Sequence, residues 1–179
     1  DGYAIRIRGI ITVGDSTFSL IGIDDYLQDD SGAINVFHDG FLPIKLYENG
    51  AYTITGTLTS FHGKTRIDEP FFSAETSSFA HHIEPKTLLI SKLLETPERY
   101  EGMLVKFQQC GFTDGTWPAD SVDAEIIFNT PEHIDATMVL SGSSDFYTQS
   151  DPPNWPIDLV GIIRQFDELS PYTEGYKVM

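Results

Sequence analysis

The stretch Tyr52–Asp68, which reads YTITGTLTSFHGKTRID, gives the clearest indication of the fold of this chain. Apolar and polar residues alternate along Tyr52–Phe61, which is the period of a half-buried β-strand. A four-residue tip, Phe61–Lys64, contains a glycine, and a second short strand follows it. The stretch is therefore predicted to form a β-hairpin.

A weaker copy of this hairpin lies near the C-terminus, at Ile157–Met179. In both copies an apolar run reaches a glycine, which is Gly56 in the first and Gly161 in the second. An alternating strand then leads to an aromatic residue, Phe61 or Phe166, a polar loop with glycine, and a last strand. Two such hairpins in one chain predict one β-module that is used twice.

Alternating segments separated by turn residues predict the remaining strands of the two modules. In the first module they are Tyr3–Val13, with a bulge or bend at Gly9, Phe18–Leu27 and Ala33–Phe37. Phe41–Tyr47 is expected to be a short helical or irregular crossover. In the second module they are Met103–Cys110, Ala124–Phe128 and Thr137–Leu140. This pattern predicts an all-β chain of two tandem five-stranded barrels.

The boundary between the modules is predicted within Glu69–Pro85, a segment rich in proline, serine and threonine. The domains are accordingly residues 1–79 and residues 80–179, the second beginning with a linker. Leu88–Tyr100 is the one good helical segment and is predicted to lead into the second barrel. Three leucines are expected to share its apolar face, and Thr96-Pro97-Glu98 resembles the start of a second short helix. The leucines are Leu89, Leu93 and Leu94.

The start of the second module also aligns with the start of the chain, because Glu101–Phe107 lays over Asp1–Ile7. If this registration holds, the lead-in helix has a counterpart upstream of residue 1. The chain begins without methionine and ends directly after a strand-like segment, so we interpret it as a piece of a longer protein. No apolar run approaches the ~18 residues of a membrane span, and membrane insertion is not expected.

Composition narrows the classes of function. The chain has 27 acidic and 11 basic residues and a formal net charge of −16, and both halves are acidic. A strong nucleic-acid binder needs a basic surface, so any nucleic-acid binding is expected to be weak. The single cysteine, Cys110, excludes an internal disulfide framework and a cysteine zinc site, and is predicted to be a half-buried side chain.

Five strands with this order of turns fit the OB fold, a small Greek-key barrel. Three stretches resemble the OB-fold modules of secreted, sugar-nonspecific bacterial nucleases and related extracellular multidomain proteins. They are RGIITVGD (Arg8–Asp15), YLQDDSGAINVF (Tyr26–Phe37) and TGTLTSFHGKTRI (Thr55–Ile67). LLETPERYEGMLVKF (Leu93–Phe107) looks like a lead-in helix and first strand of such a module. The resemblance implies a secreted or cell-surface location and an accessory role, binding single-stranded nucleic acid beside neighbouring domains of the full-length chain.

The candidate binding face lies on the first module. Alternation places four basic side chains on its outer surface, and four aromatic or imidazole rings are candidate platforms for stacked bases. The basic residues are Arg6, Arg8, Lys64 and Arg66, and the rings are Tyr26, Phe37, Phe61 and His62. The alternative is that the basic side chains are paired with the carboxylates of one acidic surface. These carboxylates are Asp24, Asp25, Asp29 and Asp30.

Other hypotheses remain open at this point. The four aspartates around Tyr26 suggest calcium, but they lack the order of an EF-hand loop. His81-His82 with Glu84 is a weak metal candidate, and loop aromatics such as Trp117, Trp155, Phe146 and Tyr147 are either core anchors or a contact patch. No catalytic motif is present, so we expect a non-enzymatic module without metal or cofactor. The alternative function is a structural spacer or a protein–protein interaction module.

Overall fold

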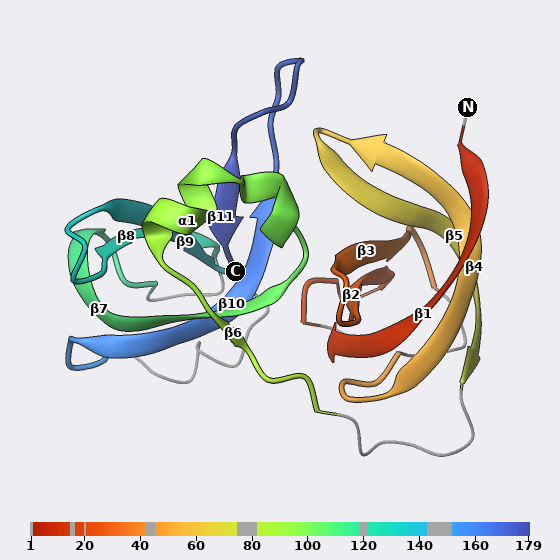
Figure 1. Cartoon of the computed structure of the whole chain (residues 1–179), viewed down its shortest axis with the longest axis horizontal. Helices are drawn as coiled ribbons and strands as arrows, with labels where there is room; N and C mark the ends of the chain where they lie inside the picture. Colours follow the sequence, from red (N-terminus) through yellow and green to blue (C-terminus); the bar gives the residue numbers. More distant parts are fainter. Residues whose placement is uncertain are drawn as a thin grey trace.

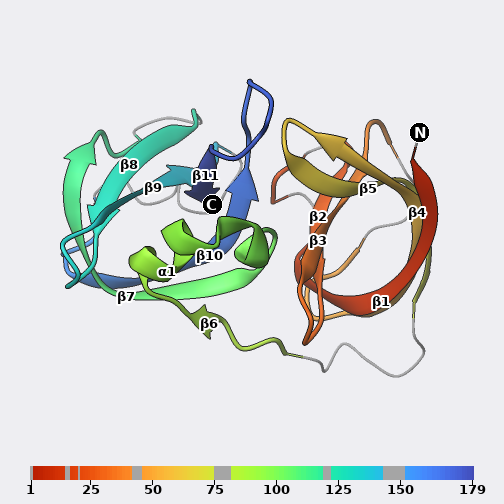
Figure 2. The same cartoon turned by 45° about the horizontal axis from the view of Figure 1, so that its top comes forward.

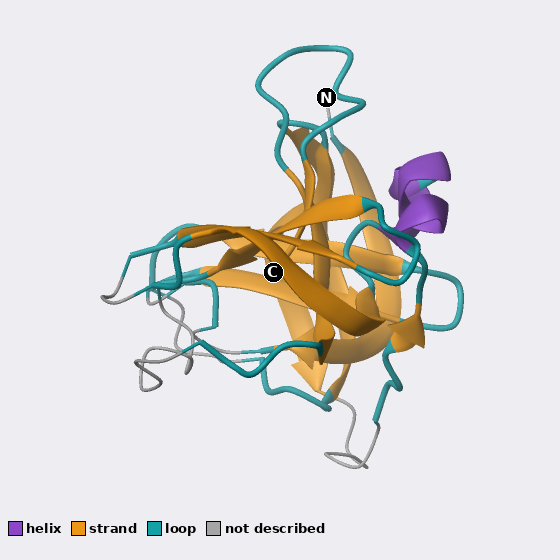
Figure 3. Cartoon of the chain, turned by 90° about the vertical axis from the view of Figure 1, so that its left-hand side faces the viewer, coloured by secondary structure: helices purple, strands orange, loops and turns teal. Residues whose placement is uncertain are grey.

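The computed structural model describes residues 2–14, 17–19, 21–41, 46–74, 82–118, 122–142 and 152–179. The chain forms two β-barrel units that lie side by side (Figures 1 and 2). Strands make up almost all of its regular structure, and the helical turns sit together at one place on the outside (Figure 3). The predicted all-β fold with a short lead-in helix is confirmed.

The first unit is a closed barrel with the strand order β1-β2-β3-β5-β4. Strands β3 and β5 are parallel, and the other neighbours are antiparallel. This is the five-stranded Greek-key arrangement of the OB fold. The strands are β1 (Tyr3–Val13), β2 (Ile23–Gln28), β3 (Ala33–His38), β4 (Ala51–Phe61) and β5 (Lys64–Ala74).

Three details differ from the sequence prediction. Strand β2 begins at Ile23 rather than Phe18, and β5 continues to Ala74. The irregularity in β1 lies between Ile11 and Val13 rather than at Gly9. Gly9 lies where β1 changes partner from β4 to β2, and a Cβ there would be 2.8 Å from the Gln28 carbonyl oxygen. The glycine therefore permits the close crossing of two strands rather than a bulge.

The β4–β5 hairpin has the predicted tip. His62 and Gly63 form a two-residue loop with positive φ angles of 51° and 87°, and Phe61 pairs with Lys64 across it. Positive φ at both loop positions gives a turn whose twist matches that of the flanking strands. The register of the pair shifts between Thr55 and Thr57, at Gly56, where a Cβ would meet the Ile67 side chain at 2.4 Å.

The second unit repeats the same strand order. Its sheet runs β10-β11-β9-β8-β7-β6, and β10 also pairs with β7, so the five main strands close on themselves. Strand β11 pairs in parallel with β9, where Val178 lies opposite Met138, as β5 pairs in parallel with β3. The strands are β6 (Lys86–Thr87), β7 (Leu104–Gly115), β8 (Ala124–Asn129), β9 (Asp135–Leu140), β10 (Ile157–Gln165) and β11 (Tyr176–Val178).

The lead-in segment is shorter than predicted and buries a different face. Helix α1 spans Ile90–Glu95, and the 3-10 turn η1 spans Pro97–Tyr100. Ile90 and Leu93 are buried, whereas Leu89 and Leu94 are 53% and 59% exposed. The expected face of three leucines is therefore wrong, because the helix packs through residues at positions i and i+3. Pro97 does begin η1, but Thr96 makes no side-chain cap.

Each barrel has its own hydrophobic core. The first is built around eight buried side chains: Ile11, Ile23, Leu27, Val36, Leu46, Tyr52, Ile54 and Ile67. The second contains Cys110 together with residues of both the barrel and the lead-in: Leu88, Ile90, Leu93, Tyr100, Met103, Val105, Phe107, Ile126, Phe128, Met138, Ile163 and Val178. The predicted boundary at residues 79/80 and most of the crossover at 41–47 lie outside the described residues.

Candidate binding site between the barrels

The β4–β5 tip contacts the loop between β10 and β11, and the two lie close together in Figure 2. The His62 ring stacks on the Phe166 ring, with centroids 4.5 Å apart and planes inclined by 23°. The Asp167 N–H donates to the His62 carbonyl oxygen at 2.9 Å, and His62 Nδ1 lies 3.1 Å from the Asp167 carbonyl oxygen. The equivalent hairpins of the two modules thus meet at the interface.

Gln165 anchors this contact. Its side chain is 2% exposed, and its amide nitrogen donates to the carbonyl oxygens of Tyr172 and Glu174 at 2.8 and 3.1 Å. The side chain lies directly against Gly63, where a Cβ would be 2.5 Å from the Gln165 amide carbon. Only glycine leaves room for this approach, so the tip residue predicted as a turn former also has an interface role.

Asp24 joins three elements through one carboxylate. Its oxygens accept hydrogen bonds from Asn35 Nδ2 on β3 at 2.7 Å, Lys64 Nζ on β5 at 3.4 Å and an Arg164 guanidinium nitrogen on β10 at 2.8 Å. Its side chain is 12% exposed. Two cations that share one carboxylate leave an excess of positive charge at this point of the interface.

A second set of contacts joins the barrels near the start of β7. Leu104 N–H donates to the Gln28 side-chain oxygen at 2.8 Å, and Thr65 N–H donates to a Glu101 carboxylate oxygen at 2.8 Å. Gly102 lies against the Tyr26 ring, with a φ of 75° that favours glycine. Burial raises the pKa of Glu101 to about 7.

A cleft of about 570 Å³ opens where the two barrels meet, and we call it the inter-barrel cleft. It combines three phenylalanine rings with four basic side chains. Its lining residues are Asp24, Phe37, Phe61, Lys64 and Arg66 from the first barrel and Asp123, Val139, Arg164, Gln165, Phe166, Gly175, Lys177 and Met179 from the second. Phe61 and Phe166 are 43% and 53% exposed, so both side chains are partly open to solvent.

Arg66 is held between two of these rings. Its guanidinium carbon lies 4.2 Å from the Phe37 ring centroid and 4.5 Å from the Phe61 centroid. Its Nε lies 2.8 Å from an Asp68 carboxylate oxygen. This sandwich fixes the planar cation and both rings in one wall of the cleft.

The remaining cations differ in burial. Lys64 is 6% exposed, and burial lowers its pKa, although Asp24 opposes that shift. Lys177 pairs with Glu125 and is more accessible than Lys64 or Arg164. Lys177 is therefore the cation that a ligand reaches with least rearrangement.

The eight residues predicted as one binding face do not share one surface. Phe37, Phe61, Lys64 and Arg66 line the inter-barrel cleft, with His62 beside it in the interface. Tyr26 is fully buried, which prevents it from offering a face to a stacked base. Arg6 lies on the outer surface of β1 in a shallow groove with Phe71, and Arg8 lines a different pocket. Tyr26 is buried because the second barrel, at Gly102, covers the side of the first barrel on which Tyr26 lies.

The competing ion-pair hypothesis is met by Lys64. Lys64 pairs with Asp24, as that hypothesis requires, and Arg66 pairs with Asp68 rather than with one of the four named aspartates. Asp29 instead closes its own turn by accepting hydrogen bonds from Ser31 and Gly32. These bonds lower the pKa of Asp29.

The sequence did not predict that residues of the second barrel line the cleft. Arg164, Lys177 and Phe166 were not among the predicted site residues. The signal for Phe166 was present, because it is the counterpart of Phe61 in the repeated hairpin. No such pattern marked the two cations, which reach the cleft only because the barrels are packed together.

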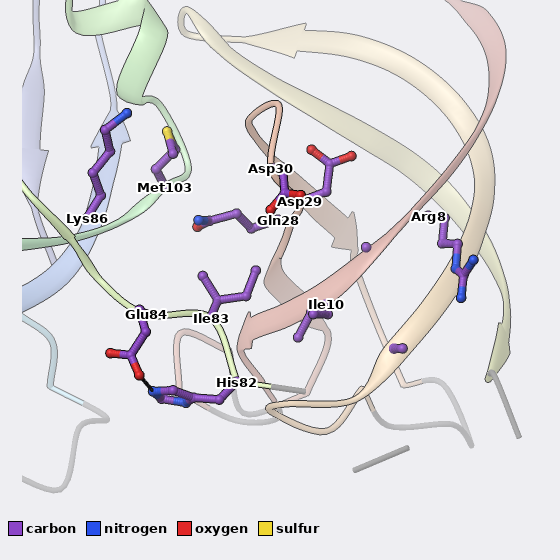
Figure 4. Close-up of a pocket in the computed structure, with 12 residues that line it drawn as sticks. Arg8, Ile10, Gln28, Asp29, Asp30, His82, Ile83, Glu84, Lys86 and Met103 are labelled. Atoms are coloured by element: carbon purple, nitrogen blue, oxygen red, sulfur yellow. Dashed lines mark ion pairs between the residues drawn. The ribbon is translucent and has the colours of Figure 1, made fainter. Parts of the chain in front are cut away.

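A larger pocket of about 750 Å³ lies between the first barrel and the linker (Figure 4). Arg8, Gln28, Asp29 and Lys86 are among its lining residues, and the His82 ring lies 3.5 Å from the Glu84 carboxylate at its edge. No aromatic ring other than that imidazole is among the lining residues identified in the described part of the chain. Its mixed charges and lack of stacking surfaces make it a poorer candidate than the inter-barrel cleft.

The metal hypotheses gain no support. Within the described ranges, no group of three or more histidine, cysteine or acidic side chains is placed to hold a metal ion. His81, Phe146 and Tyr147 lie outside those ranges, whereas Trp117 and Trp155 pack against the second core. Cys110 is buried, and burial raises the pKa of its thiol to about 11, as for a core side chain.

The strand order and the cleft define a two-barrel protein of the OB-fold class. No protein-family model matches the chain. The chain is similar to the endonuclease YhcR of Bacillus subtilis (strain 168), with 30% identity over 108 residues. The match covers 57% of this chain but only 9% of the endonuclease. The described residues contain no helix long and apolar enough to cross a membrane.

Two solved structures match the chain over most of its length. A chain from a replication protein A heterotrimer bound to single-stranded DNA matches 90% of this chain and 44% of its own length, with 14% identity and a TM-score of 0.37. A chain from a structure described as "Structural mimicry for functional antagonism" matches 98% of this chain and 90% of its own length, with 12% identity and a TM-score of 0.43. Scores this low define no family relationship.

Proposed function

We propose that this chain is a non-catalytic module that binds single-stranded nucleic acid weakly in the inter-barrel cleft. The observation that carries the proposal is the meeting of two exposed phenylalanine rings, Phe61 and Phe166, with cations from both barrels in one cleft. Proteins that bind single strands combine aromatic platforms for the bases with basic groups for the phosphates. The cleft offers both kinds of group within one concave surface.

The charges of the chain explain why the binding should be weak. The formal net charge is −16, so a polyanion is repelled except where cations gather. In the cleft, Arg66 and Lys177 each have a carboxylate partner of their own. Lys64 and Arg164 instead share one carboxylate, that of Asp24. A phosphate must therefore compete with carboxylates for most of its contacts. The affinity should depend strongly on salt.

The similarity to an endonuclease supports nucleic acid as the ligand, because the name of that relative specifies a nuclease. The small share of the endonuclease that is matched fits an accessory part of a larger protein. A secreted or cell-surface location belongs to the same proposal and rests on the sequence resemblance to modules of secreted nucleases. We assign no catalytic step to the cleft, whose basic side chains face carboxylates and aromatic rings rather than a nucleophile beside a base.

A second candidate function is a rigid spacer or a protein-interaction module. The observation that favours it is the half-buried Asp24–Arg164 ion pair, which joins one barrel to the other. A spacer needs such a fixed orientation but needs no open aromatic surface.

Fluorescence anisotropy of labelled single-stranded oligonucleotides of about 15 nucleotides, a length that spans the site size of one or more OB folds, tests the proposal. Binding at low salt should weaken as salt rises, with a slope of log K against log salt of at most about −3 if all four cations contact phosphates. Phe61→Ala, Phe166→Ala and Lys177→Ala should each weaken binding, the aromatic changes by roughly tenfold.

Two matched variants serve as controls. Phe71→Ala removes an exposed phenylalanine outside the cleft, and Arg6→Ala removes a basic side chain from the same outer groove. Both should change the affinity by less than about twofold, which is a small change in binding free energy. Weakening by the controls but not by the cleft variants would move the site to the outer face of β1. No binding at ~20 mM salt, where screening is low, would favour the spacer.

A further inference from the structure

The first strands of the two barrels occupy equivalent positions. Ile5 of β1 lies opposite Gly56 of β4, and Val105 of β7 lies opposite Gly161 of β10. The neighbouring pairs Arg6–Thr55 and Lys106–Val160 keep the same register. The two strands can therefore be compared residue by residue, and the alignment expected from the sequence holds in the structure.

Burial at these equivalent positions differs sharply. Met103, Val105 and Phe107 are 8%, 0% and 0% exposed. Their counterparts in the first barrel are Tyr3, which is 77% exposed, and Ile5 and Ile7, which are only half-buried. Alternation places each set of three on one face of its strand. The face of the first strand is therefore covered in the second barrel, whereas the equivalent face is partly exposed in the first barrel.

The lead-in segment closes the second barrel. Strand β6 runs parallel to β7, with Lys86 opposite Val105, and Leu88 N–H donates to the Lys106 carbonyl oxygen at 2.9 Å. Ile90 and Leu93 of α1 and Tyr100 of η1 then pack into the same core as Met103 and Val105. One strand pairing and a short apolar helix together complete this barrel.

The corresponding place on the first barrel has no such cover among the described residues. Within them, the strand pairing of Tyr3–Ile7 runs along one edge only, with β4, because β2 joins β1 from Ile10 onward. A groove of about 210 Å³ lies beside the other edge, lined in part by Ile7, Leu27 and Ile34. Figure 1 shows helices beside the start of β7 but none beside the start of β1.

We infer that the open edge of β1 and the exposed face of Tyr3, Ile5 and Ile7 form a docking site for a strand–helix segment of the β6–α1 type. The occupant is a parallel strand followed by a short helix with one apolar face, supplied by the same polypeptide from the N-terminal side of Gly2. It would pair with β1 at Ile5 and Arg6, as β6 pairs with β7 at Val105 and Lys106. This inference does not depend on the inter-barrel cleft.

A chimaera tests the inference in the full chain. A second copy of residues 82–101 is joined in front of Gly2, which reproduces the spacing between β6 and β7. Hydrogen exchange of the backbone amides in Ile5–Arg8 should slow by at least about tenfold, because a covered and paired strand edge opens less often. A control chimaera carries Ile90→Ser and Leu93→Ser in the added copy only, and should show no such protection.

A second chimaera tests whether the side chains of β1 fit the added segment poorly. It carries the same added copy with Tyr3→Met, Ile5→Val and Ile7→Phe, so that β1 presents the side chains of β7. Protection in either chimaera that is absent from the serine control supports the docking site. The second chimaera has its own control with Ile90→Ser and Leu93→Ser in the added copy. If neither chimaera protects positions 5–8 more than its serine control does, the inference is wrong.

Discussion

The Arg164 guanidinium lies 2.8 Å from the Asp24 carboxylate, and this contact joins β10 of the second barrel to β2 of the first. Their side chains are 19% and 12% exposed, so the pair is largely shielded from water. An ion pair in this setting is costly to break on one side, because the remaining charge stays buried without its partner. The pair therefore makes the orientation of the barrels, and with it the cleft, sensitive to single substitutions.

Replacing Asp24 should destabilise the protein more than replacing an exposed carboxylate. Asp24→Ala leaves Lys64 and Arg164 without their shared partner, and we expect a loss of about 3 kcal/mol in the free energy of unfolding. Urea unfolding of Asp24→Ala, Arg164→Ala and the double variant gives the coupling energy of the pair. Glu95→Ala, which breaks the exposed Lys92–Glu95 pair, is the control and should cause no measurable change. Additive losses from Asp24→Ala and Arg164→Ala would show that the pair does not couple the barrels.

Glu101 should make stability depend on pH. Its pKa is raised from 4.5 to about 7 by burial, so the folded state binds more protons than the unfolded state between these values. Stability should therefore fall as the pH rises from about 4.5 to about 7. Glu101→Gln keeps an acceptor for Thr65 N–H and should remove this part of the dependence. The variant should gain about 2–3 kcal/mol relative to the wild type on going from pH 5 to pH 8. Parallel stability curves for the two proteins would contradict this.

The sequence predicted the barrels well because their signals are local. Alternation along Tyr3–Val13 and the turn at His62-Gly63 each act within a few residues, and both appear in the structure as expected. The cleft depends on how two barrels pack together, and no local pattern encodes that Arg164 reaches Asp24 across 140 positions of the chain. Tyr26 was misjudged for the same reason, since it becomes buried where Gly102 of the second module approaches it.

The lead-in helix should stabilise the second barrel through one face. Leu93 is 3% exposed and Leu94 is 59% exposed, although they are neighbours of identical chemistry. Leu93→Ala should cost about 2–5 kcal/mol in unfolding free energy, and Leu94→Ala less than about 0.5 kcal/mol. Both tryptophans, Trp117 and Trp155, pack against the second core, so tryptophan fluorescence during guanidinium unfolding reports on that barrel. Equal shifts in the two variants would mean that the helix does not complete the core.

Gly63 should be irreplaceable in the tip, whereas Gly32 should not be. Gly63 has a φ of 87°, and an added Cβ would lie 2.5 Å from the buried Gln165 side chain. Gly63→Ala therefore combines backbone strain with a steric clash and should cost about 2–3 kcal/mol. Gly32 has no atom within 4 Å of an added Cβ and does not have a positive φ that disfavours alanine. Gly32→Ala should change stability by less than about 1 kcal/mol, because the added Cβ meets no atom and alanine restricts the unfolded chain.

The same pair of variants tests whether the tip builds the cleft. Displacing Gly63 from Gln165 also moves Phe61, which forms one wall of the cleft and stacks on Arg66. Gly63→Ala should therefore weaken oligonucleotide binding even at a temperature where the variant remains folded, as judged by circular dichroism. Gly32→Ala should bind like the wild type. Normal binding by folded Gly63→Ala would show that binding does not need this contact between the two hairpins.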